Sequence, residues 1–308
     1  MLITLRVVVL VLFSSSLTFA QGTQQRSEPI IDMHMHADPS DQFTHPNPNP
    51  VTGKDPSFKN ESEHMRATFE AMRRHNIVKG VVSGPLEVVR RWYDAAPARV
   101  IASPYFEGRP DNPLPDMDAL RSAYAAGWLR AMGEIGAQYA GLPADDPKLE
   151  PYFALAEKLD IPVGLHTGLG PPGTSYRPGL GNFRVTLGSP KLLENVLVRH
   201  PKLRLYIMHG GWPYLEDTKA IMLTYPQVHA DLAVIDWIIP REEFHEYLRG
   251  LMRAGLGKQL MFGSDQMRWP EAIGMAIEGI ESASFLTPAQ KRDIFYNNAA
   301  RFLGLDKK

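Results

Sequence analysis

The fold is decided by the stretch Ile30-Ile31-Asp32-Met33-His34-Met35-His36. It begins with apolar, β-branched residues and ends in polar ones, which is typical of a buried strand that leads into a site. Side chains two positions apart on a strand point to the same face, so we expect His34 and His36 to project together. Two imidazoles side by side on a rigid strand form half of a metal site. Two histidines on a solvated edge strand are the ordinary alternative, and the pair alone does not decide between these readings.

Apolar segments and segments of helical spacing alternate along the rest of the chain. The later strands are predicted at residues 77–83, 99–106, 129–135, 161–166, 203–209, 228–235 and 259–265. Helices are predicted at residues 61–75, 86–95, 116–126, 147–159, 189–200, 214–224 and 241–254, followed by a helical tail over 270–305. Eight strand–helix units of this size predict an α/β fold, a single-domain (β/α)₈ TIM barrel with a helical C-terminal tail.

An open, doubly wound sheet is the main rival fold. Its first strand is followed by a glycine-rich loop that binds phosphate. Here the first strand runs into a long polar loop over residues 37–60, in which proline recurs at every second position from Pro46 to Pro50. The barrel is therefore favoured.

The N-terminal residues resemble a secretory signal peptide. Arg6 gives a weak positive region, an apolar run follows, and Thr18-Phe19-Ala20 forms a small-residue cleavage site. We expect a signal peptide over 1–20, a short linker over 21–28 and one barrel domain over 29–308. The apolar run is too short for a confident membrane span, although an uncleaved signal anchor is the competing interpretation. The expected location is secreted or periplasmic.

Composition narrows the class of partner. The chain has 308 residues, of which 44% are hydrophobic and 22% charged, as in an ordinary globular protein, and it has no cysteine for disulfides. Formal net charge is −1, and removal of the leader with its single arginine leaves it near −2. This balance gives no case for nucleic acid or for an anionic membrane surface. We expect a small-molecule substrate, no nucleic acid and no membrane contact after signal cleavage, with a homo-oligomer left open.

Polar side chains capable of binding metal end five of the predicted strands. They are His34 and His36 on the first strand, Glu134 on the fourth, His166 on the fifth, His209 on the sixth and Asp265 on the eighth. The C-terminal ends of the strands of a (β/α)₈ barrel meet at one mouth, where catalytic residues lie. Taken singly, each has an ordinary alternative: a satisfied core histidine, a helix cap or an ion pair. Taken together, the six residues predict a metal site.

Five motifs in a fixed order carry a family resemblance. They are Ile31-Asp32-Met33-His34-Met35-His36, Gly164-Leu165-His166, Met208-His209-Gly210-Gly211-Trp212-Pro213, Phe262-Gly263-Ser264-Asp265 and Ile294-Phe295-Tyr296-Asn297-Asn298-Ala299-Ala300-Arg301. With this order and spacing the chain resembles the amidohydrolase superfamily, in the amidohydrolase-related family of metal-dependent hydrolases and non-oxidative decarboxylases.

The resemblance implies a catalytic divalent metal, most often zinc, bound by His34, His36, His166 and Asp265. His209 would bind a second ion or orient water and substrate. Glu134 falls where relatives with two ions place a bridging ligand, so one ion or two stay open, and the acidic side chain favours two. A divalent ion held in this way lowers the pKa of bound water to about 7. We expect Asp265 to accept the proton of water and pass it to the leaving group, and His209 to stabilise the developing oxyanion.

Substrate selection is expected from the loops after the strands. Arg177, Trp212 and Arg268 are candidate substrate-binding residues, and aromatic rings with arginines suggest a small organic acid. Rim packing and surface ion pairs are the alternatives for each of them. The function predicted is metal-dependent hydrolysis of a small carbonyl compound: a lactone, an amide or an ester. The alternative is non-oxidative decarboxylation by a carbon–carbon lyase with the same ligands. A TatD-like nuclease, suggested by Gly133-Glu134-Ile135-Gly136, is less favoured because the chain lacks a basic surface signal.

Overall fold

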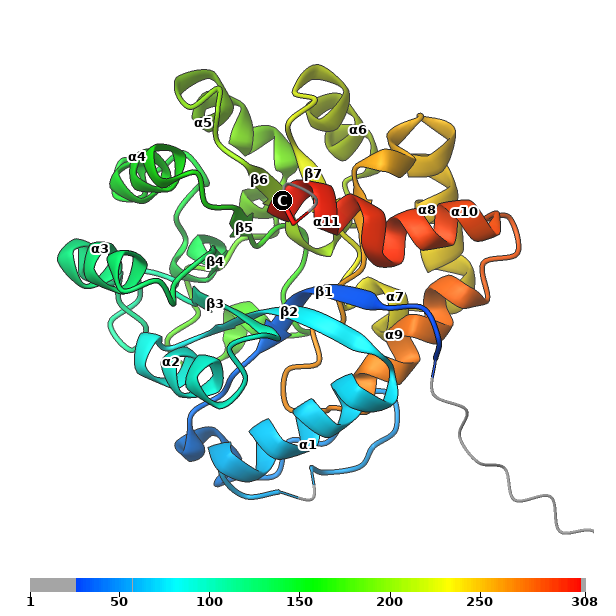
Figure 1. Cartoon of the computed structure of the whole chain (residues 1–308). Coiled ribbons are helices and arrows are strands. Elements are labelled where there is room, and N and C mark those ends of the chain that lie inside the picture. Colours follow the sequence, from blue (N-terminus) through cyan, green and yellow to red (C-terminus); the bar gives the residue numbers. More distant parts are fainter. Residues whose placement is uncertain (1–25, 57, 306–308) are drawn as a thin grey trace, which may run out of the picture.

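The computed structural model describes residues 26–56 and 58–305, which form a (β/α)₈ barrel with helices around a parallel sheet (Figure 1). The strands are β1 (Ile30–His36), β2 (Ile77–Gly84), β3 (Val100–Pro104), β4 (Met132–Ile135), β5 (Val163–Leu165), β6 (Leu205–Ile207), β7 (His229–Asp231) and β8 (Leu260–Met261). The fold class predicted from the sequence is confirmed. The expected signal peptide over 1–20 and most of the linker over 21–28 lie outside the described residues.

The helices follow the strands in the expected alternation. They are α1 (Glu61–Arg74), α2 (Leu86–Ala95), α3 (Met117–Ala125), α4 (Glu150–Leu159), α5 (Glu194–Arg199), α6 (Leu215–Thr224), α7 (Ile235–Ile238), α8 (Arg241–Arg253), α9 (Ala272–Glu281), α10 (Pro288–Arg292) and α11 (Asn298–Leu303). Within the described part of the chain, no helix is both long enough and apolar enough to cross a membrane. The predicted tail over 270–305 is helical but interrupted, because a turn separates α9 from α10.

Backbone hydrogen bonds close the barrel where the strand ladders stop. The ladders join β1 to β3 and β4 to β8 as two parallel sheets. Between β3 and β4, the Phe106 N–H donates to the Glu134 carbonyl over 3.2 Å. Between β8 and β1, the Met33 N–H donates to Phe262 over 2.9 Å and the Asp265 N–H to His34 over 2.7 Å. The first and last strands are therefore neighbours, which brings residues from both ends of the chain together.

An irregularity in β1 turns its histidines into the barrel. Ile31 and Met33 belong to the apolar cluster inside the barrel, whereas Ile30 and Met35 pack in the cluster between strands and helices. The pairing of β1 with β2 shifts between Asp32 and Met35, as in a β-bulge. Bulges of this kind re-aim side chains next to active sites.

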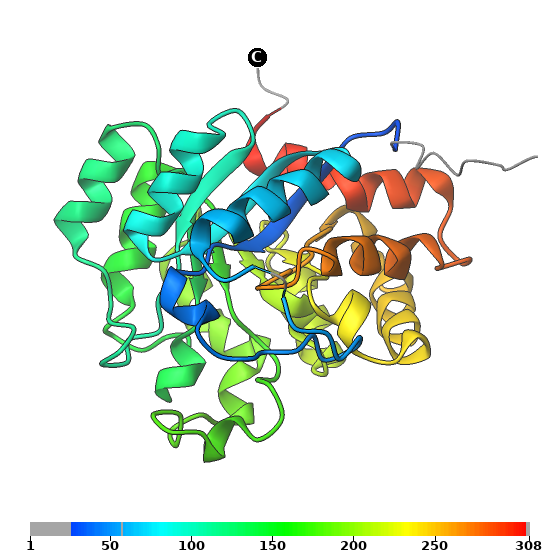
Figure 2. The same cartoon turned by 90° about the horizontal axis from the view of Figure 1, so that it is seen from below.

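Helix α11 covers the N-terminal end of the barrel. Its Phe302 ring packs 5.7 Å from the Tyr206 ring and 4.6 Å from that of His229, at the starts of β6 and β7. Figure 1 shows α11 lying across the strands, and Figure 2 shows the loops that follow the strands on the side away from the C-terminus. The opposite, C-terminal end is therefore the end where a site can open.

Six of the eight strands are shorter than the sequence predicted, and the last three show how this arises. The sixth was expected to run to residue 209, but β6 ends at Ile207 and a 3₁₀ turn, Met208–Gly211, places His209 in the left-handed region at φ 59°. The seventh was expected to run to 235, but Val234 at φ 61° turns the chain into α7. The eighth was expected over 259–265, whereas β8 covers only two residues. Buried apolar residues after the strand ends pack as turns and short helices, which hydrophobic patterning cannot tell from strand.

Candidate metal and active site

The Glu134 carboxylate lies between two pairs of histidines at the C-terminal end of the barrel. Its Oε2 is 3.4 Å from Nε2 of His34 and 3.3 Å from Nε2 of His36. Its Oε1 is 2.5 Å from Nδ1 of His166 and 3.6 Å from Nε2 of His209. One carboxylate oxygen therefore faces each pair. The structure brings these five predicted residues together at one point.

Asp265 completes the cluster from the segment that follows β8. Its Oδ1 is 3.0 Å from Nε2 of His36 and 3.8 Å from Nε2 of His34, and its Oδ2 is 4.0 Å from Nδ1 of His209. Five of the six side chains are buried, and His36 is only 13% exposed. The six residues that the sequence placed at five strand ends thus form one nearly enclosed group.

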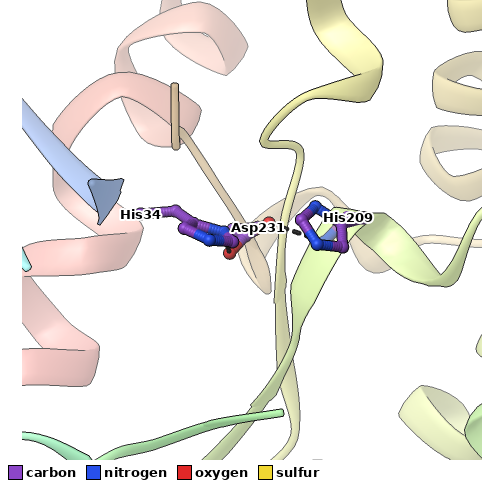
Figure 3. A group of neighbouring side chains, drawn as sticks. All are labelled: His34, His209 and Asp231. Carbon is purple, nitrogen blue, oxygen red and sulfur yellow. Dashed lines mark hydrogen bonds and ion pairs between the residues drawn. The ribbon is translucent and has the colours of Figure 1, made fainter. Parts of the chain in front are cut away.

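Asp231, at the end of β7, is a site residue that the sequence analysis missed. Its Oδ2 is 3.2 Å from Nδ1 of His34, and its Oδ1 accepts the backbone N–H of His209 over 2.8 Å. Figure 3 shows Asp231 lying between the two histidines. The contact with Nδ1 turns Nε2 of His34 toward Glu134. The bond from the His209 N–H holds His209 in its left-handed conformation, which costs about 1–3 kcal/mol in a residue other than glycine. An acidic residue inside an otherwise apolar predicted strand was the available signal.

The neighbouring strands fix the position of Glu134. The Ser83 hydroxyl donates to the Gly133 carbonyl over 2.8 Å and accepts the Glu134 N–H over 2.9 Å. The Ser103 hydroxyl donates to the same carbonyl. Gly133 has φ 108°, and a Cβ there would lie 2.1 Å from the carbonyl oxygen of Gly164. Only glycine fits this position, so the residue before Glu134 is determined by the backbone.

Carboxylates and imidazoles shift one another's pKa values in this cluster. Although burial alone would raise it, the charges of His34 and His36 lower the pKa of Asp265 to about 2. Burial opposes protonation of His36, yet Asp265 and Glu134 raise its pKa to about 9. The pKa of Glu134 lies well below its ordinary value despite burial, because four imidazoles contact it. Both acids therefore remain anionic, and positive charge is required between them.

The donor set fits a divalent cation. Nε2 of His34 and Nε2 of His36 lie 3.2 Å apart, although the bare pair of ring nitrogens can share only one proton. Nε2 of His166 is buried and has no hydrogen-bond partner among the described residues. Glu134 belongs to two groups of three residues that could each hold a metal ion. Within each group the ligand atoms lie no more than 4.8 Å apart. The groups are His34, His36 and Glu134, and Glu134, His166 and His209. Imidazole nitrogens with carboxylate oxygens are the ligands of zinc and similar ions.

Tyrosines from the β3 and β4 loops form one wall of the site. The Tyr105 ring lies 6.0 Å from that of His36, edge on, and its hydroxyl donates to buried Glu107, which also binds Arg109. The Tyr139 ring lies 4.8 Å from that of His166. The Tyr139 hydroxyl has no hydrogen-bond partner among the described residues, and burial together with Glu134 and Glu107 raises its pKa well above the ordinary value. It is therefore a free donor. Tyr139 was not among the predicted residues, although an aromatic residue five positions after Glu134 was visible.

The three predicted substrate-binding residues lie in different surroundings. Arg177 is exposed on the loop after β5, where it donates to the Pro172 carbonyl over 3.3 Å and has no ion-pair partner within residues 26–56 and 58–305. The Trp212 indole donates to Glu243 over 3.1 Å. The Arg268 guanidinium is 3.0 Å from Asp38, and it ties the β8 loop to the long loop after β1. Of the two arginines, Arg177 is the one free of an acidic partner.

Comparison with known proteins identifies the family of this chain. A family model described as Amidohydrolase matches residues 31–305. The protein fluG of Emericella nidulans is 23% identical over 115 residues, which are 37% of this chain and 12% of that protein. The chain therefore spans only a small part of the length of this relative.

Solved structures share the fold at low sequence identity. An uncharacterized TIM-barrel protein from Bordetella bronchiseptica is 19% identical, with a TM-score of 0.66 over 90% of this chain and 99% of the other. A probable 2-pyrone-4,6-dicarboxylic acid hydrolase from Acinetobacter baumannii is 14% identical, with a TM-score of 0.61 over 90% and 100% of the two chains. A 2,6-dihydroxybenzoate decarboxylase is 17% identical, with a TM-score of 0.58 over 90% and 99%.

Proposed function

The chain belongs to the amidohydrolase family, and on this premise we propose that it is a metal-dependent hydrolase of a small carbonyl compound: a lactone, an amide or an ester. The observation that carries the proposal is the Glu134 carboxylate, with one oxygen toward His34 and His36 and the other toward His166 and His209. A buried acid among four imidazoles serves packing poorly, because every member needs a charged or hydrogen-bonding partner.

His34, His36, His166 and Asp265 would hold a divalent ion, with Glu134 and His209 as ligands shared with or belonging to a second. Zinc is our candidate, and the sharing of Glu134 between two ligand groups supports two ions. When bound, such an ion lowers the pKa of water to about 7 and polarises a carbonyl group.

Asp265 is proposed to accept the proton of the attacking water and to deliver it to the leaving group. Its low pKa keeps it ionised, and its Oδ1 and Oδ2 face histidines on two sides of the site. If a single ion is bound and His209 is not a ligand, His209, held by Asp231 through its backbone N–H, would donate a hydrogen bond to the oxygen on which charge develops. These two residues complete the proton transfer and the charge stabilisation of hydrolysis.

The wall of the site supports a substrate that carries oxygen atoms on its far side. The Tyr139 hydroxyl has no hydrogen-bond partner within the described part of the chain, and Arg177 lies on the loop after β5. A hydroxyl and a guanidinium without an acidic partner suit a carboxylate or a second carbonyl oxygen. We therefore include a small organic acid with a hydrolysable carbonyl group among the expected substrates.

Decarboxylation of an unsaturated or aromatic acid is the second candidate function. The structurally similar proteins include a decarboxylase as well as a hydrolase, and they share the barrel. A carboxylate bound by Arg177 and Tyr139 would suit either reaction. Hydrolysis is preferred because soluble export, suggested by the N-terminal residues, fits the breakdown of external compounds better. The secreted or periplasmic location and zinc as the metal are parts of this proposal, as are a small-molecule partner and the absence of nucleic acid and membrane partners.

One experiment separates the two functions. The protein is purified, its metal content is measured by elemental analysis, and it is assayed with a panel of lactones, amides, esters and carboxylic acids. We expect bound divalent metal and chelator-sensitive hydrolysis without carbon dioxide, measured as release of acid from lactones and esters by titration at constant pH and as release of ammonia or amine from amides. Carbon dioxide release without consumption of water would overturn the hydrolase and support the lyase.

A further inference from the structure

Gln266 joins the last residue of β1 to the chain after β8. Its side chain is fully buried. Its Nε2 donates to the His36 carbonyl over 2.7 Å, and its Oε1 accepts the His36 N–H over 3.0 Å. The amide therefore pairs with both backbone groups of one residue, as a neighbouring strand would. The orientation of the amide is determined, because the N–H of His36 needs an acceptor and its carbonyl a donor.

This pairing continues the seam between the first and last strands beyond the point where backbone hydrogen bonds end. The final backbone bond of the seam runs from the Asp265 N–H to the His34 carbonyl. The next link is the side chain of Gln266. Because Gln266 follows Asp265 directly, it fixes His36 relative to that carboxylate, and the two facing atoms are Nε2 of His36 and Oδ1 of Asp265, 3.0 Å apart.

The backbone around Gln266 is strained in a way that suits this role. Asp265 has φ 45° and Met267 has φ 44°, both in the left-handed region that non-glycine residues rarely adopt. Such residues cost about 1–3 kcal/mol each and persist where the surroundings hold them. The two turns point the intervening side chain into the barrel wall, so Gln266 reaches His36 instead of solvent.

We propose that Gln266 is a positioning residue that holds His36 opposite Asp265 and thereby sets the affinity of the site for a divalent ion. The inference rests on the proposed function in one respect, that the cluster binds such an ion. Groups that orient metal ligands typically contribute 10-fold to 100-fold to metal affinity.

The residue before β8 offers a matched control. Gln259 is partly buried, and its Nε2 donates to the carbonyls of Val228 over 2.7 Å and of Met222 over 3.2 Å. It therefore joins backbone segments as Gln266 does, but at the end of the barrel away from the histidines. If Gln266 served only to stabilise the fold, substitutions of Gln266 and of Gln259 would have the same effect on metal affinity.

The test measures Zn²⁺ affinity of the full-length protein by competition with a chromogenic chelator, together with the melting temperature of the metal-free protein. Gln266→Met removes both hydrogen bonds at similar volume, and Gln266→Asn keeps the amide but is one methylene too short to reach both groups. We expect each to weaken Zn²⁺ binding 10-fold to 100-fold, whereas Gln259→Met lowers the melting temperature and leaves the affinity within about twofold of wild type.

Wild-type affinity in either folded Gln266 variant would overturn the proposal and leave the proposed function standing. Weakened binding of the same size in Gln259→Met would also overturn it, because the effect would then follow stability and not the position of His36. If the unaltered protein bound no divalent ion at all, the proposed function would fail and this inference with it. The three results are distinguishable in one titration series.

Discussion

Buried His64 and the buried histidines at the barrel mouth differ in what surrounds them. His64 on α1 is enclosed by aromatic rings, with ring centroids 5.2 Å from Phe43, 5.2 Å from Phe58 and 5.4 Å from Trp92. Burial lowers its pKa to about 4. At the barrel mouth, burial acts in the same direction, but carboxylates outweigh it and raise the pKa of His36 to about 9.

The difference teaches that burial does not make a histidine a ligand. His64 packs among aromatic rings, and the acidic residue whose charge acts on it, Asp38, already has Arg268 as its partner. The mouth histidines share their space with Glu134 and Asp265, so positive charge must be supplied by protons or by a metal ion. Anionic neighbours separate a site from a core, and each prediction below changes one side of this contrast.

The largest effect is expected from Asp265→Asn, which removes a carboxylate from the mouth with little change in shape. Turnover should fall by about 10³-fold, since an amide cannot accept the proton of water, while far-UV circular dichroism stays unchanged. Steady-state kinetics with a substrate from the assay panel measure this. Asp217→Asn, on α6 beside Lys191, is the matched control and should keep wild-type turnover. Near-wild-type turnover in Asp265→Asn would remove Asp265 from the proton transfer.

A smaller effect concerns the pH dependence of stability and tests the other side of the contrast. The pKa of His64 is about 4 in the folded protein and 6.5 ordinarily. Between these two pH values, His64 is protonated in the unfolded chain but neutral in the folded one. The contribution of neutral, buried His64 to the free energy of unfolding is therefore fully present above pH 6.5, and it is lost as the pH falls toward 4.

His64→Met should abolish this part of the acid destabilisation. Between pH 7 and pH 5, the free energy of unfolding of the wild type should fall by about 2 kcal/mol more than that of the variant. Urea denaturation at the two pH values measures the difference. Parallel pH dependences in the two proteins would show that His64 titrates normally in the folded state.

The smallest effect is expected from Asp231→Asn, which alters a residue behind the ligands. The amide oxygen can still accept from Nδ1 of His34, but the side chain loses the second acceptor that holds the N–H of His209. We expect a loss in Zn²⁺ affinity at the lower end of the usual range, about tenfold. Chelator competition measures it, with Asp293→Asn at the opposite end of the barrel as the control. Unchanged affinity would show that Asp231 serves folding alone.

The sequence predicted the barrel and the meeting of its ligands for one physical reason. Buried parallel strands read as continuous apolar runs, and their C-terminal ends must share one mouth, so His34 and Asp265 could be placed together although the whole chain separates them. His64 and His200 both lie outside the cluster of candidate ligands. His200 pairs with Glu150 and Glu157 near the outer surface.

What the sequence could not supply was the point at which each strand stops. Asp231 was hidden within a strand predicted to continue to residue 235, and the role of Gln266 depends on turns that no hydrophobic pattern shows. The ion pair of Arg268, a candidate substrate-binding residue, could not be foreseen either, because the loop over residues 37–60 supplies its partner Asp38. Such loop contacts depend on three-dimensional closure and leave no periodic signal.

The pairing of β1 with the segment around β8 determines when the set of donors is complete during synthesis of the chain. His34 and His36 precede Asp265 and Gln266 by most of the barrel, so a growing chain holds only an incomplete set of donors until the segment after β8 has been made. A cation can therefore meet the complete set of donors only after the segment that carries Asp265 and Gln266 has folded against β1.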